Sequence, residues 1–279
     1  MIDIGEHNKL KIARVAPPGL YLQDEDENEV LLPNKYVQDE HKIGDYLTVF
    51  VYNDSEDRMV ATLEQPAVVL NRFASLKVNQ VGDVGAFLDW GLGKDLLVPF
   101  SEQQTKMEEG KWYVIFLYKD EKTNRLVGSS KISKHLQQFH ITLIPGDEVE
   151  LMVYQKTDIG YKVIINEEHD GLLYANEVFR DIKPGDKLDG YVKKIRPDNK
   201  IDVTLQKSTK SEVDILSAQL MDQLQNNNGF LPYNDRTDAQ TIYTTFKVSK
   251  KVFKKALGFL YKKRKVSISD KGIILKNNG

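Results

Sequence analysis

Three stretches of the chain share one spacing of glycines and apolar residues, and this repeat limits what the sequence can fold into. A glycine opens a Gly-x-x-(Leu/Val) fragment at Gly19, Gly85 and Gly160. Fourteen residues after each of these glycines, and directly after a short apolar run, stand Pro33, Pro99 and Tyr174. Twenty-five residues after the same glycines stand Gly44, Gly110 and Gly185. Because three identical spacings point to duplication of one unit, we interpret the chain as a tandem triplication.

Each repeat is expected to be a small domain, because its length exceeds the roughly 20 to 50 residues of a solenoid repeat. Its apolar runs are short, alternating and rich in Val, Ile, Leu, Tyr and Phe, and turn residues such as Asn53-Asp54 separate them. This pattern predicts a compact antiparallel barrel. The predicted barrels span residues 1–63, 77–132 and 144–208. The first predicted linker spans 64–76 and contains a short helix after Pro66. The second spans 133–143 and lies within a predicted helical connector over 131–144.

The pattern changes beyond Lys207, where apolar residues recur at helical spacing. One helix is predicted to bury Leu216, Leu220 and Leu224, and a second begins at Thr237. Ser249 is predicted to cap a third helix, whose inward residues are Val252, Phe253, Ala256, Leu257 and Leu260. A hairpin over 266–275 completes a domain at 211–279 that resembles a winged helix. The predicted fold is therefore mostly β, with three tandem antiparallel barrels and a small C-terminal α+β domain.

Composition limits the class of protein. The chain has 279 residues, no cysteine, 41% hydrophobic residues and 29% charged residues. These values suit several small domains in a reducing compartment. The N-terminus has no basic segment followed by an apolar one, and no window reaches the roughly 18 apolar residues of a membrane span. We therefore expect a cytoplasmic protein with no membrane partner.

The net charge of −2 hides a strong asymmetry along the chain. Residues 1–62 contain six Lys or Arg against thirteen Asp or Glu, a net of −7, whereas residues 247–276 contain eleven Lys or Arg and one Asp, a net of +10. A polyanion is expected to approach the C-terminal end. The alternative is that these lysines are only a solvated surface.

The central repeat carries the most specific motif, Gly85-Ala-Phe-Leu-Asp-Trp-Gly-Leu-Gly-Lys-Asp-Leu-Leu-Val-Pro-Phe-Ser101. With the alternating strand and the Asp-x-x-x-Arg that follow, it resembles the S1 domain, a five-stranded OB-type barrel that binds RNA. The whole chain resembles the bacterial conserved virulence factor B (CvfB/YitL-like) family, in which S1 modules precede a winged helix. This resemblance implies post-transcriptional control of gene expression, including that of virulence factors.

The resemblance also implies RNA-binding residues in the second barrel. Phe87 matches the base-stacking aromatic residue of the family, and Asp120 and Arg125 match its polar pair. Two positions depart from the pattern, because Val84 replaces a second aromatic residue and Pro99 replaces a histidine. The alternative is that Phe87 and Trp90 pack against a neighbouring domain.

The third barrel and the winged helix add further candidates, because cations that alternate with rings suit a single strand of RNA. In the third barrel these are Tyr161, Tyr174, Tyr191, Lys193, Lys194, Arg196 and Lys200. In the third helix they are the outward-facing Lys250, Lys251, Lys254 and Lys255. The first barrel retains Tyr21, Asp54 and Arg58, but its negative charge argues against strong RNA binding.

No catalytic residue, metal site or cofactor is expected. Gly91-Leu-Gly-Lys94 lacks the first Gly and the Ser/Thr of a phosphate loop, and the five histidines are scattered. The acidic Asp24–Glu29 stretch lacks the Gly and Glu of a calcium loop. The leading hypothesis is a non-catalytic regulator that binds single-stranded RNA. The alternatives are a transcription regulator that binds double-stranded DNA, and an interaction scaffold on the ribosome or RNA polymerase.

Overall fold

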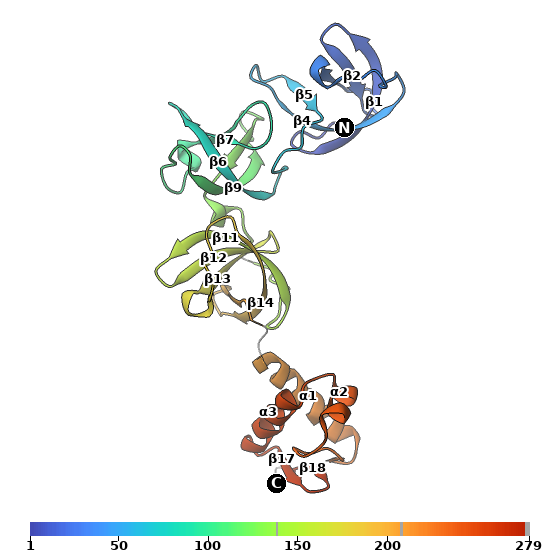
Figure 1. Ribbon diagram of the computed structural model, residues 1–279, viewed down its shortest axis with the longest axis vertical. Coiled ribbons are helices and arrows are strands. Elements are labelled where there is room, and N and C mark those ends of the chain that lie inside the picture. Colours follow the sequence, from blue (N-terminus) through green and yellow to red (C-terminus); the bar gives the residue numbers. More distant parts are fainter. Residues whose placement is uncertain (138, 207–208, 277–279) are drawn as a thin grey trace. The chain divides into compact units, whose positions relative to one another are not determined.

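The computed structural model describes residues 1–137, 139–206 and 209–276 (Figure 1). The chain divides into two compact units. The first unit contains Met1–Ile141 and Glu150–Leu188, and the second contains Thr142–Val149 and Asp189–Gly279. The predicted change of pattern at Lys207, and the last three residues 277–279, lie outside the described residues.

The first barrel is built from β1 to β5, whose bounds are His7–Ala16, Gly19–Gln23, Glu29–Pro33, Tyr46–Asn53 and Met59–Thr62. The strands close in the order β1-β2-β3-β5-β4, and β3 and β5 pair in parallel through Leu31 and Val60. A 3-10 turn, η1 (Asn34–Tyr36), follows β3. The inward residues of alternating positions form the core, which includes Ile12, Leu22 and Leu32.

The second barrel has the same arrangement with one opening. Its strands β6 to β10 span Phe73–Val81, Gly85–Asp89, Leu96–Pro99, Trp112–Lys119 and Leu126–Ser129. They form a five-stranded sheet in the order β10-β9-β6-β7-β8, so β8 and β10 are the two edges. The 3-10 turn η2 (Phe100–Glu102) follows β8, as η1 follows β3.

The third set of strands repeats the order of the first. Strands β11 to β15 span Glu148–Thr157, Gly160–Ile165, His169–Tyr174, Lys187–Ile195 and Ile201–Thr204. They form a closed barrel in the order β11-β12-β13-β15-β14, and η4 (Ala175–Glu177) follows β13. The predicted triplication of a five-stranded barrel is therefore confirmed.

The glycine that opens each repeat is required by a close approach between two strands. The backbone of Gly85 has a φ of +158°, and a Cβ atom there would lie 2.3 Å from the carbonyl oxygen of Val98. The same contact would be 2.0 Å at Gly19 and 2.2 Å at Gly160. Each glycine faces its partner across a hairpin, as Gly85 faces Pro99. The fourteen-residue spacing is therefore the register of this hairpin.

The second glycine of each repeat secures a bulge in the first strand. The pairing register shifts between Ile12 and Arg14 in the first barrel, and equivalent shifts occur in β6 and β11. The backbone N–H of Gly44 donates to the carbonyl of Ile12 at 2.9 Å. Gly110 and Gly185 donate in the same way to the carbonyls of Val78 and Val153. The twenty-five-residue spacing therefore joins the glycine that begins the second strand of each barrel to the glycine that contacts the bulge of the first strand.

The helix predicted after Pro66 is wrong. Residues 64–72 are irregular, and β6 begins at Phe73, inside the predicted linker. The N–H of Ala67 donates to Trp90 at 2.7 Å, and that of Leu70 donates to Gly5 at 2.8 Å. Because carbonyl groups of the two barrels accept hydrogen bonds from these backbone N–H groups, the segment satisfies them without forming a helix.

The helical connector predicted at 131–144 is also wrong. Among its described residues, only Ile132–Lys134 forms a helical turn, the 3-10 turn η3. Ile132 and Leu136 are buried with Phe73, Met152 and Ile164 in one apolar cluster. The residues whose helical spacing predicts the connector are Leu136, Phe139, His140 and Leu143, and of these only Leu136 is buried, so the spacing does not mark a buried helix face.

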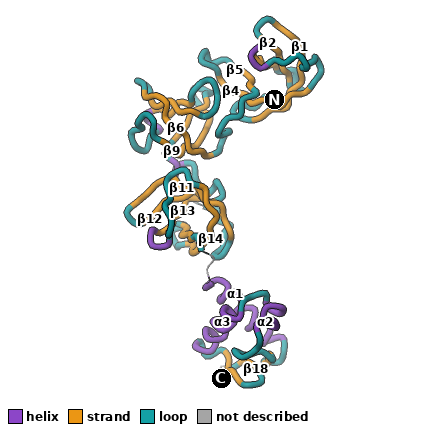
Figure 2. Tube along the Cα trace, viewed as in Figure 1, coloured by secondary structure: helices purple, strands orange, loops and turns teal. Residues whose placement is uncertain are grey.

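The C-terminal domain is a winged helix, as predicted. Its elements are α1 (Thr209–Asn226), β16 (Phe230–Leu231), α2 (Ala239–Phe246), α3 (Lys250–Lys262), β17 (Val266–Ser269) and β18 (Gly272–Leu275). Figure 2 shows α1, α2 and α3 side by side in this domain. Asp238 caps α2 by accepting from the N–H of Thr241, and Ser249 caps α3 by accepting from the N–H of Val252. The five predicted inward residues of α3 are all buried. Within the described part of the chain, no helix is long and apolar enough to cross a membrane.

Candidate nucleic-acid interface

Phe87 lies on the outer face of the second barrel, beside a cleft that this barrel shares with the first. Its neighbours along β7, Ala86 and Leu88, are buried in the core, whereas Phe87 is half-buried. The cleft has a volume of about 340 Å³. The second barrel lines it with residues that include Phe87, Trp90, Lys94 and Arg125, and the first barrel with Tyr52, Asn53, Ser55 and Asp57. We call this hollow the interbarrel cleft.

Trp90 joins the two barrels at the base of this cleft. Its side chain is 3% exposed, and its ring meets those of Phe50 and Tyr52 edge-on at centroid distances of 5.8 and 6.2 Å. The indole N–H donates to the carbonyl of Lys94 at 2.6 Å. The expectation that Trp90 packs against a neighbouring domain is therefore confirmed, while the half-buried Phe87 keeps a surface in the cleft.

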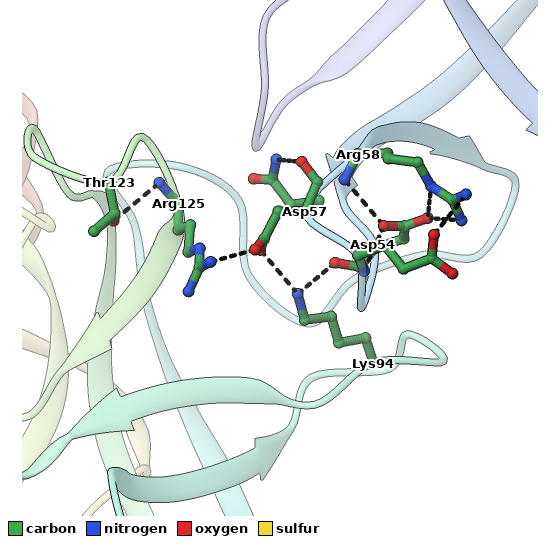
Figure 3. A network of polar contacts seen from close by, with 8 residues as sticks. Asp54, Asp57, Arg58, Lys94, Thr123 and Arg125 are labelled. Carbon is green, nitrogen blue, oxygen red and sulfur yellow. Dashed lines mark hydrogen bonds and ion pairs between the residues drawn. The ribbon is translucent and has the colours of Figure 1, made fainter.

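The polar pair expected from the resemblance does not form a pair within the second barrel. The Asp120 carboxylate accepts from the backbone N–H groups of Thr123 at 3.0 Å and Lys122 at 2.7 Å, and these hydrogen bonds lower the pKa of Asp120. Asp120 therefore holds the β9–β10 turn. The Arg125 guanidinium instead reaches the first barrel and donates to the carboxylate of Asp57 (Figure 3).

The equivalent turn of the first barrel keeps its own pair. Arg58 donates to Asp54 Oδ2 through Nε at 2.9 Å and Nη2 at 2.7 Å. Partial burial opposes ionisation of Asp54, but the hydrogen bonds from Arg58 hold the pKa of Asp54 below its usual value. Lys94 of the second barrel donates to the backbone carbonyl of Asp54 at 2.6 Å and lies 3.9 Å from the Asp57 carboxylate (Figure 3).

The third barrel has a lysine where the other two have an outward ring. The strand register aligns Lys162 with Tyr21 and Phe87, since each stands two residues after the repeat glycine and just past the bulge in the partner strand. Tyr161 therefore shares a strand face with the buried Val163 and is half-buried. Tyr174 is half-buried opposite Gly160, where the other barrels have proline.

The cations predicted in the third barrel lie together on the β14–β15 hairpin, Lys193 and Lys194 on β14 and Arg196 and Lys200 in the turn. Lys193 and Lys194 are exposed at the bulge of β14, and Tyr191 is half-buried opposite Thr204. Arg196 Nη2 donates at 2.6 Å to the carboxylate of Asp202, a residue only 8% exposed. Lys200 lies 3.1 Å from Asp198, and this contact lowers the pKa of Asp198. Arg196 and Lys200 therefore already have carboxylate partners.

The lysines predicted on α3 face away from the core of the winged helix. Lys251, Lys254 and Lys255 are exposed, and Lys250 is half-buried, with its Nζ 3.5 Å from the carbonyl of Arg236. The first turn of α3 contains no acidic residue. Because a helix N-terminus carries partial positive charge, this end of α3 attracts anions more strongly than the lysines would alone.

Sequence reasoning missed two residues of the interbarrel cleft, Lys94 and Asp57. Lys94 belongs to the loop Gly91-Leu-Gly-Lys94, whose sequence resembles an incomplete phosphate loop and gives no sign of a contact with the first barrel. Asp57 lies 68 residues from Arg125 in the sequence. No local pattern in the sequence indicates that Asp57 contacts Arg125 or Lys94.

Comparison with known proteins assigns the domains. The S1 domain model matches residues 4–64 and 72–131, and the model of the CvfB-like winged helix domain matches residues 218–275. The chain is 25% identical to the protein YitL of Bacillus subtilis, over 94% of this chain and 90% of that protein. It is 23% identical to Conserved virulence factor B of Staphylococcus epidermidis, over 87% of this chain and 84% of that protein.

A similar solved structure is a multidomain protein with nucleic acid binding domains from Streptococcus pneumoniae TIGR4. Its sequence is 22% identical, and the alignment covers 98% of each chain with a TM-score of 0.42. The domain matches show that S1 and winged-helix domains, both of types that bind nucleic acids, make up much of this chain.

Proposed function

We propose that this chain, which combines S1 domains with a CvfB-like winged-helix domain, is a non-catalytic regulator of gene expression that binds single-stranded RNA. The observation that carries the proposal is the half-buried ring of Phe87 in an S1 domain, beside a cleft that Lys94 and Arg125 also line. A flat apolar face binds an unpaired base, and neighbouring cations bind its phosphate.

The other candidate residues along the chain also combine rings that bind bases with cations that bind phosphates. Tyr161, Tyr174 and Tyr191 offer rings in the third barrel, and Lys193, Lys194, Arg196 and Lys200 offer cations on its last hairpin. The lysines of α3 offer phosphate contacts that depend on salt rather than on base sequence. Asp120 acts indirectly in this scheme, by holding the turn from which Arg125 extends.

The relatives named Conserved virulence factor B suggest which genes are regulated. From this name we propose that RNA binding by the chain alters the expression of virulence factors in a bacterial cytoplasm. We assign the acidic surface of the first barrel outside the interbarrel cleft to contact with a protein partner, such as one on the ribosome or RNA polymerase, because its negative charge disfavours RNA.

The choice of nucleic acid gives the first test. Purified protein should bind an unstructured RNA oligonucleotide more tightly than a DNA duplex of equal length, because ring stacking requires unpaired bases. Both affinities are measured by fluorescence anisotropy at one fixed salt concentration, with single-stranded DNA of the same sequence as a control for strandedness. Tighter binding to the DNA duplex would reject the proposal and favour a transcription regulator.

That second function has one observation in its favour, the winged helix itself, whose third helix enters the DNA groove in many proteins. Base edges are read by Arg or Lys at guanine and by Asn or Gln at adenine. The sequence of α3, Lys250–Lys262, contains Lys but no Arg, Asn or Gln. Its lysines suit phosphates of either nucleic acid and leave guanine as the one base they are able to select, so α3 supports duplex binding with little base selection.

A substitution at Phe87 tests the stacking contact. Phe87→Ala should lower the affinity for single-stranded RNA about tenfold, since loss of one stacked ring costs about 1 to 3 kcal/mol. The slope of log affinity against log salt should stay unchanged, because no charge is removed. Phe139→Ala removes a ring that is 68% exposed in the connector, and it should leave both quantities unchanged. Equal losses in the two variants would contradict a specific contact at Phe87.

A further inference from the structure

The interbarrel cleft has the size and lining of a site for one nucleotide. Its volume of about 340 Å³ lies within the roughly 300 to 1,000 Å³ of small-ligand sites. The outer face of β7 contributes the ring of Phe87, and Lys94 and Arg125 contribute cations. The first barrel contributes a wall through Tyr52 and Asn53, so the cleft exists only where the two barrels meet.

A carboxylate of the first barrel now occupies the cationic side of this cleft. Asp57 accepts from Arg125 Nη2, and the same carboxylate lies 3.9 Å from Lys94 Nζ (Figure 3). Asp57 stands at the tip of the β4–β5 turn with a φ of +61°, a left-handed conformation that few residues other than Gly, Asn and Asp adopt readily. The turn thus presents one carboxylate to two cations of the neighbouring barrel.

The two repeats use equivalent arginines differently. Asp54 and Asp120 both accept two backbone N–H groups at Oδ1, and in the first barrel Asp54 Oδ2 also accepts two hydrogen bonds from Arg58 in its own turn. In the second barrel the Arg125 side chain extends out of its turn and donates to Asp57 instead. The Arg125 side chain is 53% exposed and that of Asp57 is 40% exposed.

An exposed ion pair of this kind contributes little free energy and can be exchanged. Surface pairs between Arg and Asp are worth about 0 to 1 kcal/mol. A phosphate carries the same sign of charge and also binds arginine through two parallel hydrogen bonds. An RNA phosphate beside a base stacked on Phe87 is therefore able to displace Asp57.

We infer that the interbarrel cleft binds one nucleotide of single-stranded RNA, its base against Phe87 and its phosphate on Arg125 and Lys94, in the place that the Asp57 carboxylate holds without RNA. The inference rests on the proposed function, since it describes how one of its sites is formed and regulated. The first barrel then weakens RNA binding by competing for the cations of the second.

The substitution Asp57→Asn tests this competition in the full chain. Asparagine has nearly the same shape as aspartate and tolerates a left-handed backbone, so the turn is retained. Removal of the carboxylate frees one cation for phosphate. Affinity for an unstructured RNA oligonucleotide should therefore rise about fivefold at about 0.1 M salt, and the log-log salt slope should steepen by about 0.7. Affinity is measured by fluorescence anisotropy over a series of salt concentrations.

Two further variants separate local competition from general charge. Glu56→Gln removes the same charge one residue away, where the side chain is 70% exposed and contacts Arg58. It should change the affinity less than about twofold, because an exposed charge is screened within about 10 Å. In a background that carries both Arg125→Gln and Lys94→Gln, Asp57→Asn should give no gain beyond that of Glu56→Gln in the same background.

The outcomes distinguish this inference from the proposed function. If wild-type protein binds RNA but Asp57→Asn and Glu56→Gln behave alike, the inference is wrong and the proposed function stands. A gain that persists without both Arg125 and Lys94 also overturns the inference. If the wild-type chain binds no single-stranded RNA, both fail.

Discussion

Replacing Lys250, Lys251, Lys254 and Lys255 with glutamate should lower the affinity for single-stranded RNA more than a hundredfold at about 0.1 M salt, because each phosphate contact contributes about 0.7 to the log-log salt slope. The slope itself should become shallower by up to about 2.8. The measurement is a salt series of RNA titrations with the full chain.

The winged helix should still fold in this variant. The core face of α3, from Val252 to Leu260, is untouched, and the Ser249 cap remains. Glutamate has a helix propensity close to that of lysine and is favoured at a helix N-terminus. Circular dichroism and thermal unfolding check this expectation.

The matched control replaces the same four lysines with arginine, which keeps the charges. Affinity and slope should then stay close to the wild-type values. If the glutamate variant binds RNA with unchanged affinity and slope, α3 is a solvated surface, and RNA binding belongs to the barrels alone.

The parts of the fold that were predictable from sequence are those fixed by local geometry. Only glycine fits at Gly85, since a Cβ would collide with Val98, and the repeats at Gly19 and Gly160 have the same constraint. The amphipathic pattern of α3 predicted its five buried residues, because a helix has one face toward the core. Both features depend on residues close together in the sequence.

The errors arose where packing between barrels replaced local structure. The spacing of Leu136, Phe139, His140 and Leu143 predicts a connector helix, yet only Leu136 of the four is buried, in an apolar cluster with Ile132. The segment after Pro66 gives its backbone hydrogen bonds to the barrels on either side, as Ala67 does to Trp90. A spacing rule counts apolar residues and does not register which partners cover them.

The candidate site was predictable only in part, for a similar reason. Phe87 was assigned from its motif, and it lies on the outer face beside the cleft. The ring expected at Tyr161 shares a face with buried Val163, and counting from the repeat glycine would have indicated Lys162 instead. The contact of Arg125 with Asp57 joins two domains and has no local signature.

One consequence of this packing is that the first two barrels share a core. Phe50, Tyr52 and Val60 of the first barrel belong to the same buried cluster as Trp90, Leu92 and the interior of the second. The stability of each barrel should therefore depend on the other. Trp90 is the largest side chain at this junction, and its N–H is also hydrogen-bonded.

Trp90→Ala should lower the free energy of unfolding of the first two barrels by about 3 to 5 kcal/mol, the cost of removing a buried aromatic side chain and leaving a cavity. Hydrogen exchange in denaturant, followed by mass spectrometry of barrel peptides, measures this in the full chain without assuming that all domains unfold together. The chain has one other tryptophan, Trp112, whose side chain is 61% exposed at the start of β9. Trp112→Ala should therefore cost less than about 1 kcal/mol. If the two variants lose equal stability, or if peptides of the first barrel exchange as in the wild type when Trp90 is removed, then the two barrels are independent and the shared core does not join them.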